Sequence, residues 1–493
     1  MRRIAIVIGC FCVISTLTWG VESSSNFEKY WPTWRGPNAT GVAPEADPPI
    51  EWNEDKNIRW KILIPGKGYS SPIVWGEQVF VTTAIETDKP VDPKLIEAAQ
   101  QRQRNRFRRP GQRGGFRPRG GAGDSPPHGD GEGPPRRRGE GVRGSEGQRG
   151  SFMRGVQPTK IYHFDILAIN CRDGGIVWQR TAHEAVPHEG THNEGSWAST
   201  SLVTDGESIY AYFGSRGLYC YNMQGNPKWE KDFGDMTIKL GFGEGSSPVL
   251  YGEVIIVNWD HEGQSFIIAL DKETGEERWK VNRDEPTSWS TPIVVEHNGK
   301  PQVITSATNA TRGYDLATGE LIWECGGMTM NTVPSPVSAD GMVYVTSGFR
   351  GNALQAIRLA SAFGDITDKK AVVWEYDRDT PYTPSPLLYG DKLYFLKRNN
   401  GILSCFNAST GEAYYGPQRM GGIEGNVFAS PVGAANRVYL SGGNGTTLVI
   451  KHGPQFEVLA QNVLDSGFTA SPAIVGSEIY LRGYKYLYCI AAD

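Results

Sequence analysis

The stretch GSSPVLYG at residues 245–252 decides the fold, because it is the clearest copy of a unit that recurs along the chain. The unit is a Ser-Pro pair, two or three apolar residues, a glycine and then a strand in which apolar and polar residues alternate. Further copies begin at Ser71-Pro72, Thr291-Pro292, Ser335-Pro336, Ser385-Pro386, Ser430-Pro431 and Ser471-Pro472, with a degenerate copy at Thr200-Ser201. From Pro248 onward the prolines lie 44, 44, 50, 45 and 41 residues apart. Eight copies at this spacing fit the four-stranded blades of a β-propeller.

A second element completes each unit, and its clearest copy is ALDKETGEERW at residues 269–279. Asp271 can bond the backbone two residues on, Gly275 supplies a tight turn, and Trp279 is a large plate that can pack against the next blade. We therefore assign this motif to structure rather than to chemistry. Its members and their equivalents are Asp271, Gly275, Trp279, Asp315, Gly319, Trp323, Trp178 and Trp60, and other copies end at Trp229, Trp374 and Tyr415.

The two ends of the chain complement each other. The last unit stops at Asp493 after its third strand, and a matching strand at 57–61 precedes the first Ser-Pro. Pairing these strands closes the ring and removes open sheet edges. The sequence thus predicts an all-β fold over residues 57–493, an eight-bladed β-propeller of four-stranded blades closed by the N-terminal strand. The composition agrees, since 61 glycines and 14 tryptophans exclude a mainly helical protein.

Several stretches carry a resemblance to a known family. They are WPTWRGP at 31–37, GSSPVLYG at 245–252, the element that ends at Trp279, and the closing segment 481–490. The chain resembles the PQQ-binding-like β-propeller repeat proteins of the quinoprotein alcohol dehydrogenase-like superfamily, often grouped as BamB-like. The resemblance covers about residues 30–84 and 160–493 and is specific for the fold. It leaves the activity open, because one fold hosts many functions.

The first residues predict export. Residues 1–20 combine Arg2 and Arg3, an apolar run from Ile4 to Leu17 and small residues before a cleavage site, as in a signal peptide. The run is too short for a membrane span. A lipoprotein box at Cys10 comes too early and is followed by more apolar chain, so we do not favour it. We expect a periplasmic or extracellular monomer with no transmembrane segment, in which residues 21–56 form an N-terminal extension.

The cysteines do not indicate a disulfide scaffold. Cleavage leaves five of the seven, an odd number that cannot all pair. Cys220, Cys405 and Cys489 occupy one equivalent strand position, where another repeat has Ala269. We predict that they are small buried apolar residues.

An Arg/Gly/Pro-rich insertion over residues 86–158 interrupts blade 1. Asp92 and Pro93 can begin a short helix, and beyond Pro110 we expect disorder. Residues 102–154 hold 14 Arg against 5 acidic residues, a net charge of +9 that leaves −13 for the rest of the chain. The tract is an inert linker, a contact for an acidic surface such as an envelope polyanion or the protein's own acidic propeller, or a nucleic-acid contact. An exported protein meets little RNA, so we do not expect a nucleic-acid partner.

If the four strands of each blade are lettered A to D from the axis to the rim, one face of the propeller should carry the B–C loops and the D–A links between blades. Aromatic residues mixed with both charge signs are typical of a binding face, and ordinary solvated loops with packed tryptophans are the alternative. The candidate face residues are Trp197, Arg216, Trp259, Asp260, His261, Trp289, Arg350, Lys397, Arg398, Asn399, Arg482 and Lys485.

Two sequence patterns resemble catalytic sites, but both are weak evidence for catalysis. His188 to His192 matches H-E-x-x-H, but zinc binding needs a helix there, and Pro187 and Gly190 oppose one. The family resemblance implies a quinone held between a tryptophan and a ring of two adjacent cysteines, with Ca²⁺ and an aspartate base. No two cysteines are adjacent, and Asp260 or Glu262 fits the base only loosely. We predict no catalytic residue, metal or cofactor, with PQQ and Ca²⁺ as the alternative.

Together these observations favour an exported, non-catalytic scaffold that binds a protein or another ligand on one face. By resemblance it would act in envelope protein assembly. The alternatives are a PQQ-dependent alcohol or sugar dehydrogenase and a protein that binds a polyanion or carbohydrate.

Overall fold

The computed structural model describes residues 27–97, 101, 156 and 158–492. The signal peptide predicted over 1–20 and most of the Arg-rich tract lie outside these residues. A helical turn covers residues 93–97, and Asp92 Oδ1 accepts the Lys94 N–H at 2.9 Å, which confirms the predicted start of this helix.

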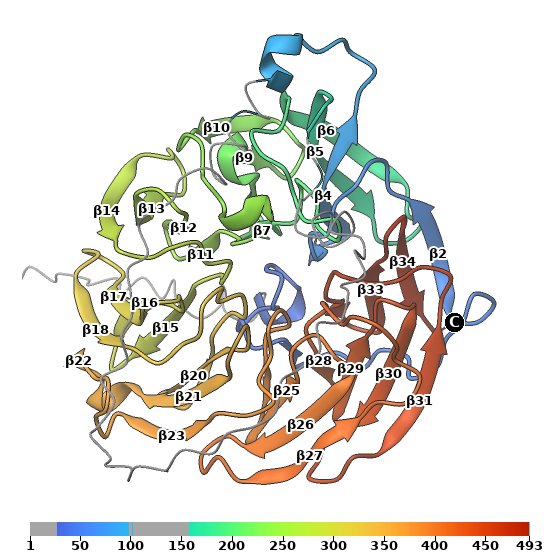
Figure 1. Ribbon diagram of the computed structural model, residues 1–493. Coiled ribbons are helices and arrows are strands. Elements are labelled where there is room, and N and C mark those ends of the chain that lie inside the picture. Colours follow the sequence, from blue (N-terminus) through green and yellow to red (C-terminus); the bar gives the residue numbers. More distant parts are fainter. Residues whose placement is uncertain (1–26, 98–100, 102–155, 157, 493) are drawn as a thin grey trace, which may run out of the picture.

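Eight sheets follow one another around a central axis (Figure 1). Blade 1 consists of β3 (Ile73–Trp75), β4 (Gln78–Glu86), β5 (Tyr162–Asn170) and β6 (Ile176–Ala185). Blade 2 consists of β7 (Val203–Thr204), β8 (Ser208–Tyr212), β9 (Leu218–Asn222) and β10 (Pro227–Lys231). Blade 3 consists of β11 (Val249–Tyr251), β12 (Val254–Trp259), β13 (Ser265–Asp271) and β14 (Glu277–Arg283). Blade 4 consists of β15 (Ile293–His297), β16 (Lys300–Thr305), β17 (Thr311–Asp315) and β18 (Leu321–Cys325).

The second half repeats the plan. Blade 5 consists of β19 (Val337–Ala339), β20 (Met342–Ser347), β21 (Ala353–Arg358) and β23 (Val372–Tyr376). Blade 6 consists of β24 (Leu387–Tyr389), β25 (Lys392–Leu396), β26 (Ile402–Asn407) and β27 (Ala413–Arg419). Blade 7 consists of β28 (Val432–Ala434), β29 (Arg437–Ser441), β30 (Thr446–Lys451) and β31 (Val458–Val463). The extra strands are β1 (Val42–Ala43) and β22 (Gly364–Asp365), and the 3₁₀ helices are η1 (Gly214–Arg216), η2 (Lys239–Gly241) and η3 (Leu359–Ser361).

Blade 8 combines both ends of the chain. Its strands are β32 (Ala473–Val475), β33 (Glu478–Arg482), β34 (Tyr486–Ala491) and, at the rim, β2 (Ile58–Leu63). Strand β2 pairs antiparallel with β34, for example Trp60 opposite Cys489. The predicted all-β fold, the eight blades and the closure of the ring by the N-terminal strand are therefore confirmed.

A tryptophan of one blade packs on a glycine of the next. The Trp279 indole donates to the Leu316 carbonyl at 2.8 Å, and a Cβ added to Gly319, at φ +76°, would lie 2.6 Å from the indole ring. Only glycine allows this close approach. The same arrangement joins Trp60 to Gly174, Trp178 to Gly225, Trp229 to Gly275, and Trp374 to Gly411.

Trp323 departs from this arrangement. The turn that should receive it, in blade 5, is replaced by the longer connection 359–371 with β22. Its indole donates instead to Gln302 Oε1 at 3.0 Å, inside its own blade. The motif residue is still structural, because Trp323 is fully buried.

The Ser-Pro repeat forms a closed ring of hydrogen bonds around the axis. The backbone N–H of each Ser or Thr donates to the hydroxyl of its equivalent in the following blade, at 2.9–3.0 Å. Ser471 completes the circle by donating to Ser71 Oγ at 2.9 Å. The register of the degenerate copy was wrong by one residue. Ser201, not Thr200, takes the ring position, and Leu202 stands where the other copies have proline.

The N-terminal extension crosses the axis at one end of the ring (Figure 1). Trp31 exchanges two backbone hydrogen bonds with Val74 of β3, at 3.0 and 2.8 Å. The Arg35 guanidinium donates to the carbonyls of Pro386 at 2.7 Å and Pro431 at 3.0 Å, and β1 pairs in parallel with β28. Periodicity did not predict this segment's path, because it lies outside the repeat.

Candidate binding face

The propeller has two faces that differ in their connections. The link face carries the D–A links and the B–C loops, and the hairpin face carries the A–B and C–D turns. The insertion departs after β4 and returns at β5, so it belongs to the link face. Val156, near its end, exchanges backbone hydrogen bonds with Thr191 of the link between blades 1 and 2 at 2.7 and 3.1 Å.

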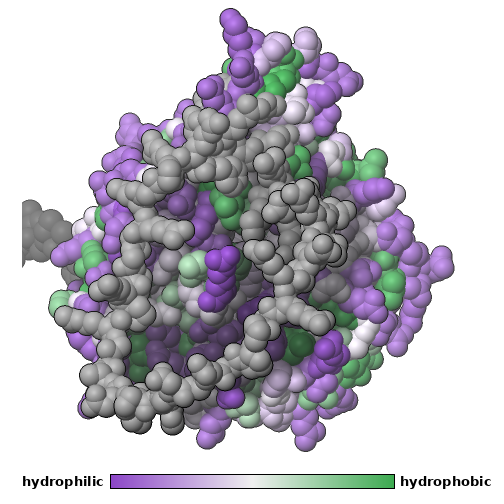
Figure 2. All heavy atoms as spheres, viewed as in Figure 1, coloured by the Kyte–Doolittle hydropathy of each residue, from purple (hydrophilic) through white to green (hydrophobic). Residues whose placement is uncertain are grey.

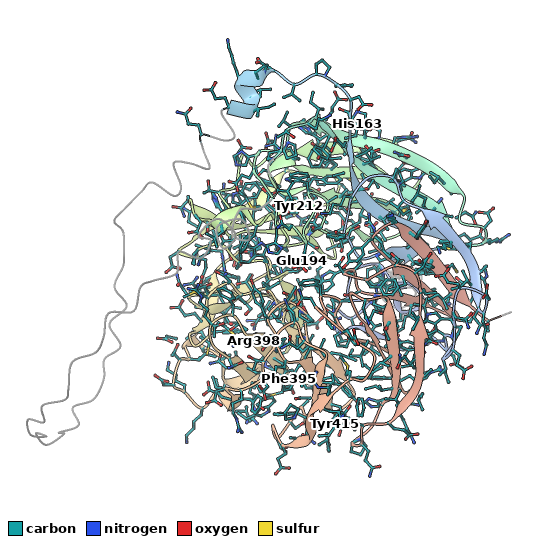
Figure 3. The ribbon with its side chains drawn as sticks, turned by 45° about the vertical axis from the view of Figure 1, so that its right-hand side comes forward. His163, Glu194, Tyr212, Phe395, Arg398 and Tyr415 are labelled. Atoms are coloured by element: carbon teal, nitrogen blue, oxygen red, sulfur yellow. The ribbon has the colours of Figure 1, made fainter. Side chains whose placement is uncertain are left out.

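Contacts between distant links bridge the axis on the link face. Asn426, in the link between blades 6 and 7, donates to Glu194 Oε1 of the link between blades 1 and 2 at 3.1 Å. Figure 3 labels Glu194 near the middle of the molecule. The Lys67 ammonium group donates to the Asn193 carbonyl at 3.3 Å. The middle of the link face is thus built from hydrogen-bonded loops.

Asp260 is enclosed in an ion pair. Its carboxylate accepts from the Arg283 guanidinium at 2.8 and 3.1 Å and from Ser288 Oγ at 2.7 Å, and neither side chain of the ion pair is exposed. Tyr314 holds the other side of the guanidinium at 2.7 Å. Because every partner of Asp260 is a buried structural group, this carboxylate does not face a ligand.

Arg482 is also interior. It donates to Ser70 Oγ at 2.6 Å and to the Thr82 carbonyl at 2.7 Å, which joins blade 8 to blade 1. Burial lowers the pKa of Arg482 to about 9. This side chain stabilises ring closure rather than presenting charge to a partner.

Most of the other candidate residues have partners in neighbouring loops. The Trp197 indole donates to the Glu189 carbonyl and the Trp289 indole to the Gly243 carbonyl, at 2.8 and 2.7 Å. The remaining assignments are Trp259 and His261 in buried positions, Arg216 paired with Asp235, Lys397 paired with Asp379, and Asn399 accepting the Thr383 N–H.

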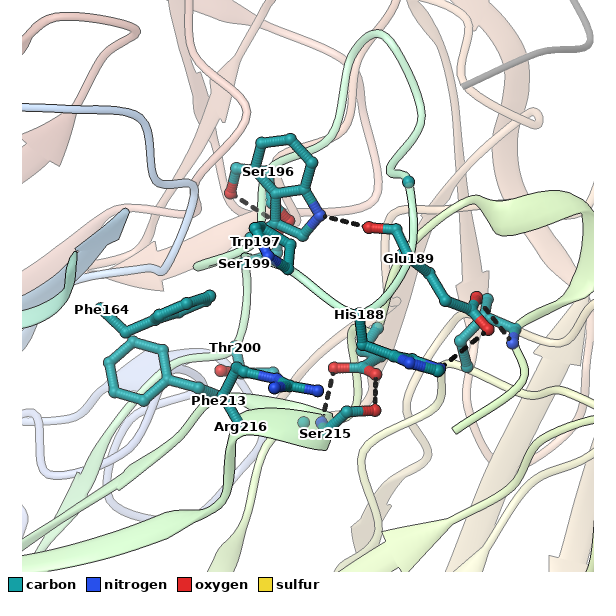
Figure 4. A pocket seen from close by; sticks show the side chains of 16 residues that line it. Phe164, His188, Glu189, Ser196, Trp197, Ser199, Thr200, Phe213, Ser215 and Arg216 are labelled. Atoms are coloured by element: carbon teal, nitrogen blue, oxygen red, sulfur yellow. Dashed lines mark hydrogen bonds and ion pairs between the residues drawn. The ribbon is translucent and has the colours of Figure 1, made fainter. Parts of the chain in front are cut away.

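The H-E-x-x-H segment is a loop, and its histidines have different partners. His188 Nε2 lies 2.7 Å from the Met236 carbonyl, whereas His192 stacks edge-on against Phe242. The adjoining pocket, lined by Glu189 and Glu244 among others, has a cavity volume of about 30 Å³ (Figure 4). Such a space holds about one water molecule. Burial raises the pKa of Glu244, which accepts the Ser215 N–H at 2.9 Å.

The described residues do not fit the quinone site that the resemblance implies. The cysteines lie in separate strands or turns, free and buried, and no two are neighbours in the sequence. Burial raises the pKa of Cys171 and Cys325 to about 11 and that of Cys220, Cys405 and Cys489 to about 12. The burial predicted for Cys220, Cys405 and Cys489 is confirmed, and Cys171 and Cys325 are buried as well. They are unreactive thiols rather than the halves of a redox pair.

A partly exposed cluster remains on the loops of blades 4 to 6, where Figure 3 labels Arg398. We call it the aromatic–arginine patch, and it consists of the exposed Met330, Arg350 and Arg398 and the half-buried Phe349 and Tyr382. Phe349 and Tyr382 have ring centroids 5.0 Å apart, and the Arg350 guanidinium lies 5.4 Å from the Phe349 ring. The Tyr382 N–H donates to the Arg398 carbonyl at 3.4 Å.

The charge of this patch is uncompensated. Arg350 and Arg398 are exposed, and within the described part of the chain neither guanidinium pairs with a carboxylate. Both have left-handed backbones, at φ +52° and +51°, in tight loop tips. The sequence predicted both arginines and the exposed Lys485 as face residues. It missed Met330, Phe349 and Tyr382. For Phe349 and Tyr382 the only signal was an aromatic residue in a B–C loop or link, and Met330 carried no signal.

Among the described residues, the exposed apolar side chains of the outer strands form no comparable cluster. Polar side chains dominate the rim in Figure 2, with smaller apolar areas between them. The exposed apolar residues on the outer D strands, such as Ile176, Leu321 and Val458, belong to different blades. Single exposed apolar residues of this kind are ordinary.

The chain is similar to known proteins in its sequence family and in its fold. A family model described as outer membrane protein assembly factor BamB matches residues 163–414 and 264–493. No curated protein matches the sequence. The crystal structure of BamB from Moraxella catarrhalis is 13% identical, covers 68% of this chain and 94% of that chain, and has a TM-score of 0.48. The computationally designed Ika8 protein is 11% identical, covers 68% and 94%, and has a TM-score of 0.46.

Proposed function

The chain belongs to the family described as outer membrane protein assembly factor BamB, and from this premise we propose that it is an exported, non-catalytic scaffold for envelope protein assembly. We propose that it binds a partner protein through the link face. The observation that carries the proposal is the aromatic–arginine patch, since aromatic residues, methionine and arginine are the types enriched in protein interfaces.

The patch is organised before any partner binds. The contact between the tilted rings of Phe349 and Tyr382 and the hydrogen bond from the Tyr382 N–H to the Arg398 carbonyl hold the loops of blades 5 and 6 together. Little conformational entropy is then lost when the partner docks. Two unpaired guanidinium groups favour a partner surface with carboxylates around an apolar centre.

Export is part of the proposal and follows from the predicted signal peptide. Among the described residues, no helix is long and apolar enough to cross a membrane. The scaffold would then work in the periplasm or outside the cell.

Polyanion binding is a second candidate, favoured by one contact. The hydrogen bonds between Val156 and Thr191 attach the end of the insertion to the link face, and residues 102–154 carry a net charge of +9. Salt-sensitive binding to heparin that disappears when residues 97–157 are deleted would support this function. Binding that survives the deletion would contradict it.

The scaffold function is tested by co-isolating the protein with its partners from the envelope of its own source after cross-linking. The double variant Arg350→Glu/Arg398→Glu should no longer co-isolate a partner protein that the parent chain retains. Arg358→Glu, at the opposite end of the same blade, is the matched control and should retain it. Equal retention by all three proteins would contradict the proposal. Turnover of alcohols or sugars that depends on added PQQ and Ca²⁺ would contradict the non-catalytic function.

A further inference from the structure

The innermost strand of each blade has one hydrogen-bonding edge that faces the axis. On the hairpin face the N-terminal extension covers several of these edges. Trp31 pairs with β3, the Pro32 carbonyl accepts the Thr204 N–H of β7 at 3.1 Å, and β1 pairs with β28. The molecule itself therefore shows that these inner edges accept an added strand.

Four consecutive inner edges, those of β11, β15, β19 and β24, have no such backbone cover among the described residues, and the first three border open hollows. Within the described residues, β11, β15 and β19 make no backbone hydrogen bonds outside their own blades. Their side chains are correspondingly open, since Val249, Leu250, Val294 and Ala339 are only half-buried. Unpaired edges of this kind are sites for strand addition.

A groove runs along these edges, and we call it the axial groove. Its main cavity has a volume of about 850 Å³ and lies between Trp34 and Arg35 of the extension and the inner strands β11 and β15. A second hollow of about 240 Å³ shares Ala39 and Val294 with it and continues to β19. The main cavity falls in the range of roughly 300–1,000 Å³ typical of ligand sites.

The walls of the groove are apolar and its rim is acidic. Glu28, Glu207, Glu253, Glu296 and Asp340 are exposed along the rim. Of these five carboxylates only Glu253 has an ion-pair partner among the described residues, and the other cation of the groove is occupied elsewhere. Lys272 already pairs with Asp205 at 3.2 Å and Glu253 at 3.1 Å, and the buried Arg35 is bonded to carbonyls.

We propose that the axial groove binds an extended, basic segment of a partner protein by strand addition to β11 or β15. Apolar side chains on one side of the segment would fill the space along Val249 and Val294. Lysine or arginine side chains on the other side would meet Glu28 and Glu207. This site lies on the face opposite the aromatic–arginine patch, so it is a second contact that does not depend on the first.

The test measures binding of a fluorescent peptide, acetyl-Val-Lys-Val-Lys-Val-Lys-amide, to the chain that begins at residue 21, by fluorescence anisotropy. The peptide should bind, its Val/Glu counterpart should not, and methylation of its backbone nitrogens should abolish binding because it removes the strand hydrogen bonds. Glu28→Lys with Glu207→Lys should weaken binding by about tenfold. Glu276→Lys, an exposed C–D turn residue outside the groove, should leave it unchanged.

Two further arms identify the occupant. Val249→Trp should block the groove and weaken binding without changing the charge. If the peptide binds only a chain that begins at residue 27, the protein's own N-terminal residues fill the groove and the proposal is overturned. Binding that persists after backbone methylation or is equal for the Glu276→Lys and Glu28→Lys/Glu207→Lys variants is nonspecific charge attraction and also overturns it.

Discussion

The two faces of this propeller belong to the same packed interior, but the axis is covered in a different way on each. On the link face, side chains such as Asn426 and Glu194 bridge the axis, and the exposed chemistry lies off-centre around Arg350 and Arg398. On the hairpin face a separate segment crosses the axis and leaves a groove beside β11 and β15. The comparison teaches that the repeated residues build the ring, whereas residues outside the repeat make the faces distinct.

The shared interior should be the most sensitive part. Trp279→Ala removes a buried indole, its hydrogen bond to Leu316 and its packing on Gly319. We expect a loss of about 3–5 kcal/mol in the free energy of unfolding, measured by chemical denaturation. The control Leu321→Ala, at an exposed rim position, should change it by less than about 0.5 kcal/mol. Similar effects for the two variants would mean that the Trp-on-Gly contacts do not stabilise the ring.

The ring of hydrogen bonds formed by the Ser-Pro repeat should have the next largest effect on stability. Ser471→Ala leaves the buried Ser430 N–H without its acceptor and should cost about 1–3 kcal/mol. Ser471→Thr keeps the hydroxyl, as Thr291 does naturally in the same ring, and should be milder. Thermal unfolding of both variants tests this. An alanine variant as stable as the threonine variant would show that this ring of hydrogen bonds does not stabilise the fold.

A histidine of the hairpin face should make the stability depend on pH. His452 stacks on Tyr389 at 4.1 Å and bonds Tyr394, and burial, with Lys392 nearby, lowers its pKa, while Asp391 opposes this. The unfolded chain then binds the proton more readily, so the folded state loses stability as the pH falls below the ordinary histidine pKa of about 6.5.

His452→Gln should remove this loss. The difference in unfolding free energy between the parent protein and the variant should therefore shrink or change sign from pH 7.5 to pH 5.5. A difference that stays constant over this range would show that His452 does not titrate with folding.

The smallest effect on stability belongs to the link-face patch. Arg350→Glu and Arg398→Glu each change an exposed side chain without a carboxylate partner among the described residues, so unfolding should shift by less than about 0.5 kcal/mol. Denaturation curves check this. A larger loss would mean that the patch stabilises the fold, and its surface chemistry would lose its functional meaning.

The fold could be predicted from the sequence because each blade corresponds to one copy of the sequence repeat. Spacing gave the blades, the Trp-on-Gly motif gave their docking, and the unfinished last unit gave the closure by β2. The N-terminal crossing was not predictable in this way. Arg35 bonds Pro431, 396 residues away, and no local pattern records such a contact.

The candidate site was only partly predictable. Loop topology assigned residues such as Asp260, Arg398 and Arg482 to one face, but it could not say which of them would be exposed. Asp260 is buried because Arg283 faces it, and Arg482 is buried because carbonyl and hydroxyl groups of blade 1 receive it. Exposure depends on partners that are remote in the sequence.

The most direct test of the central claim is site-specific photocross-linking in the native envelope, from Phe349 and from Phe363 replaced in turn by benzoylphenylalanine. Both residues belong to blade 5, on the link face and in the C–D connection respectively. We expect a discrete protein adduct from position 349 that disappears in the Arg398→Glu background, and no such adduct from position 363. An adduct from position 363 alone, or none from position 349, would contradict it.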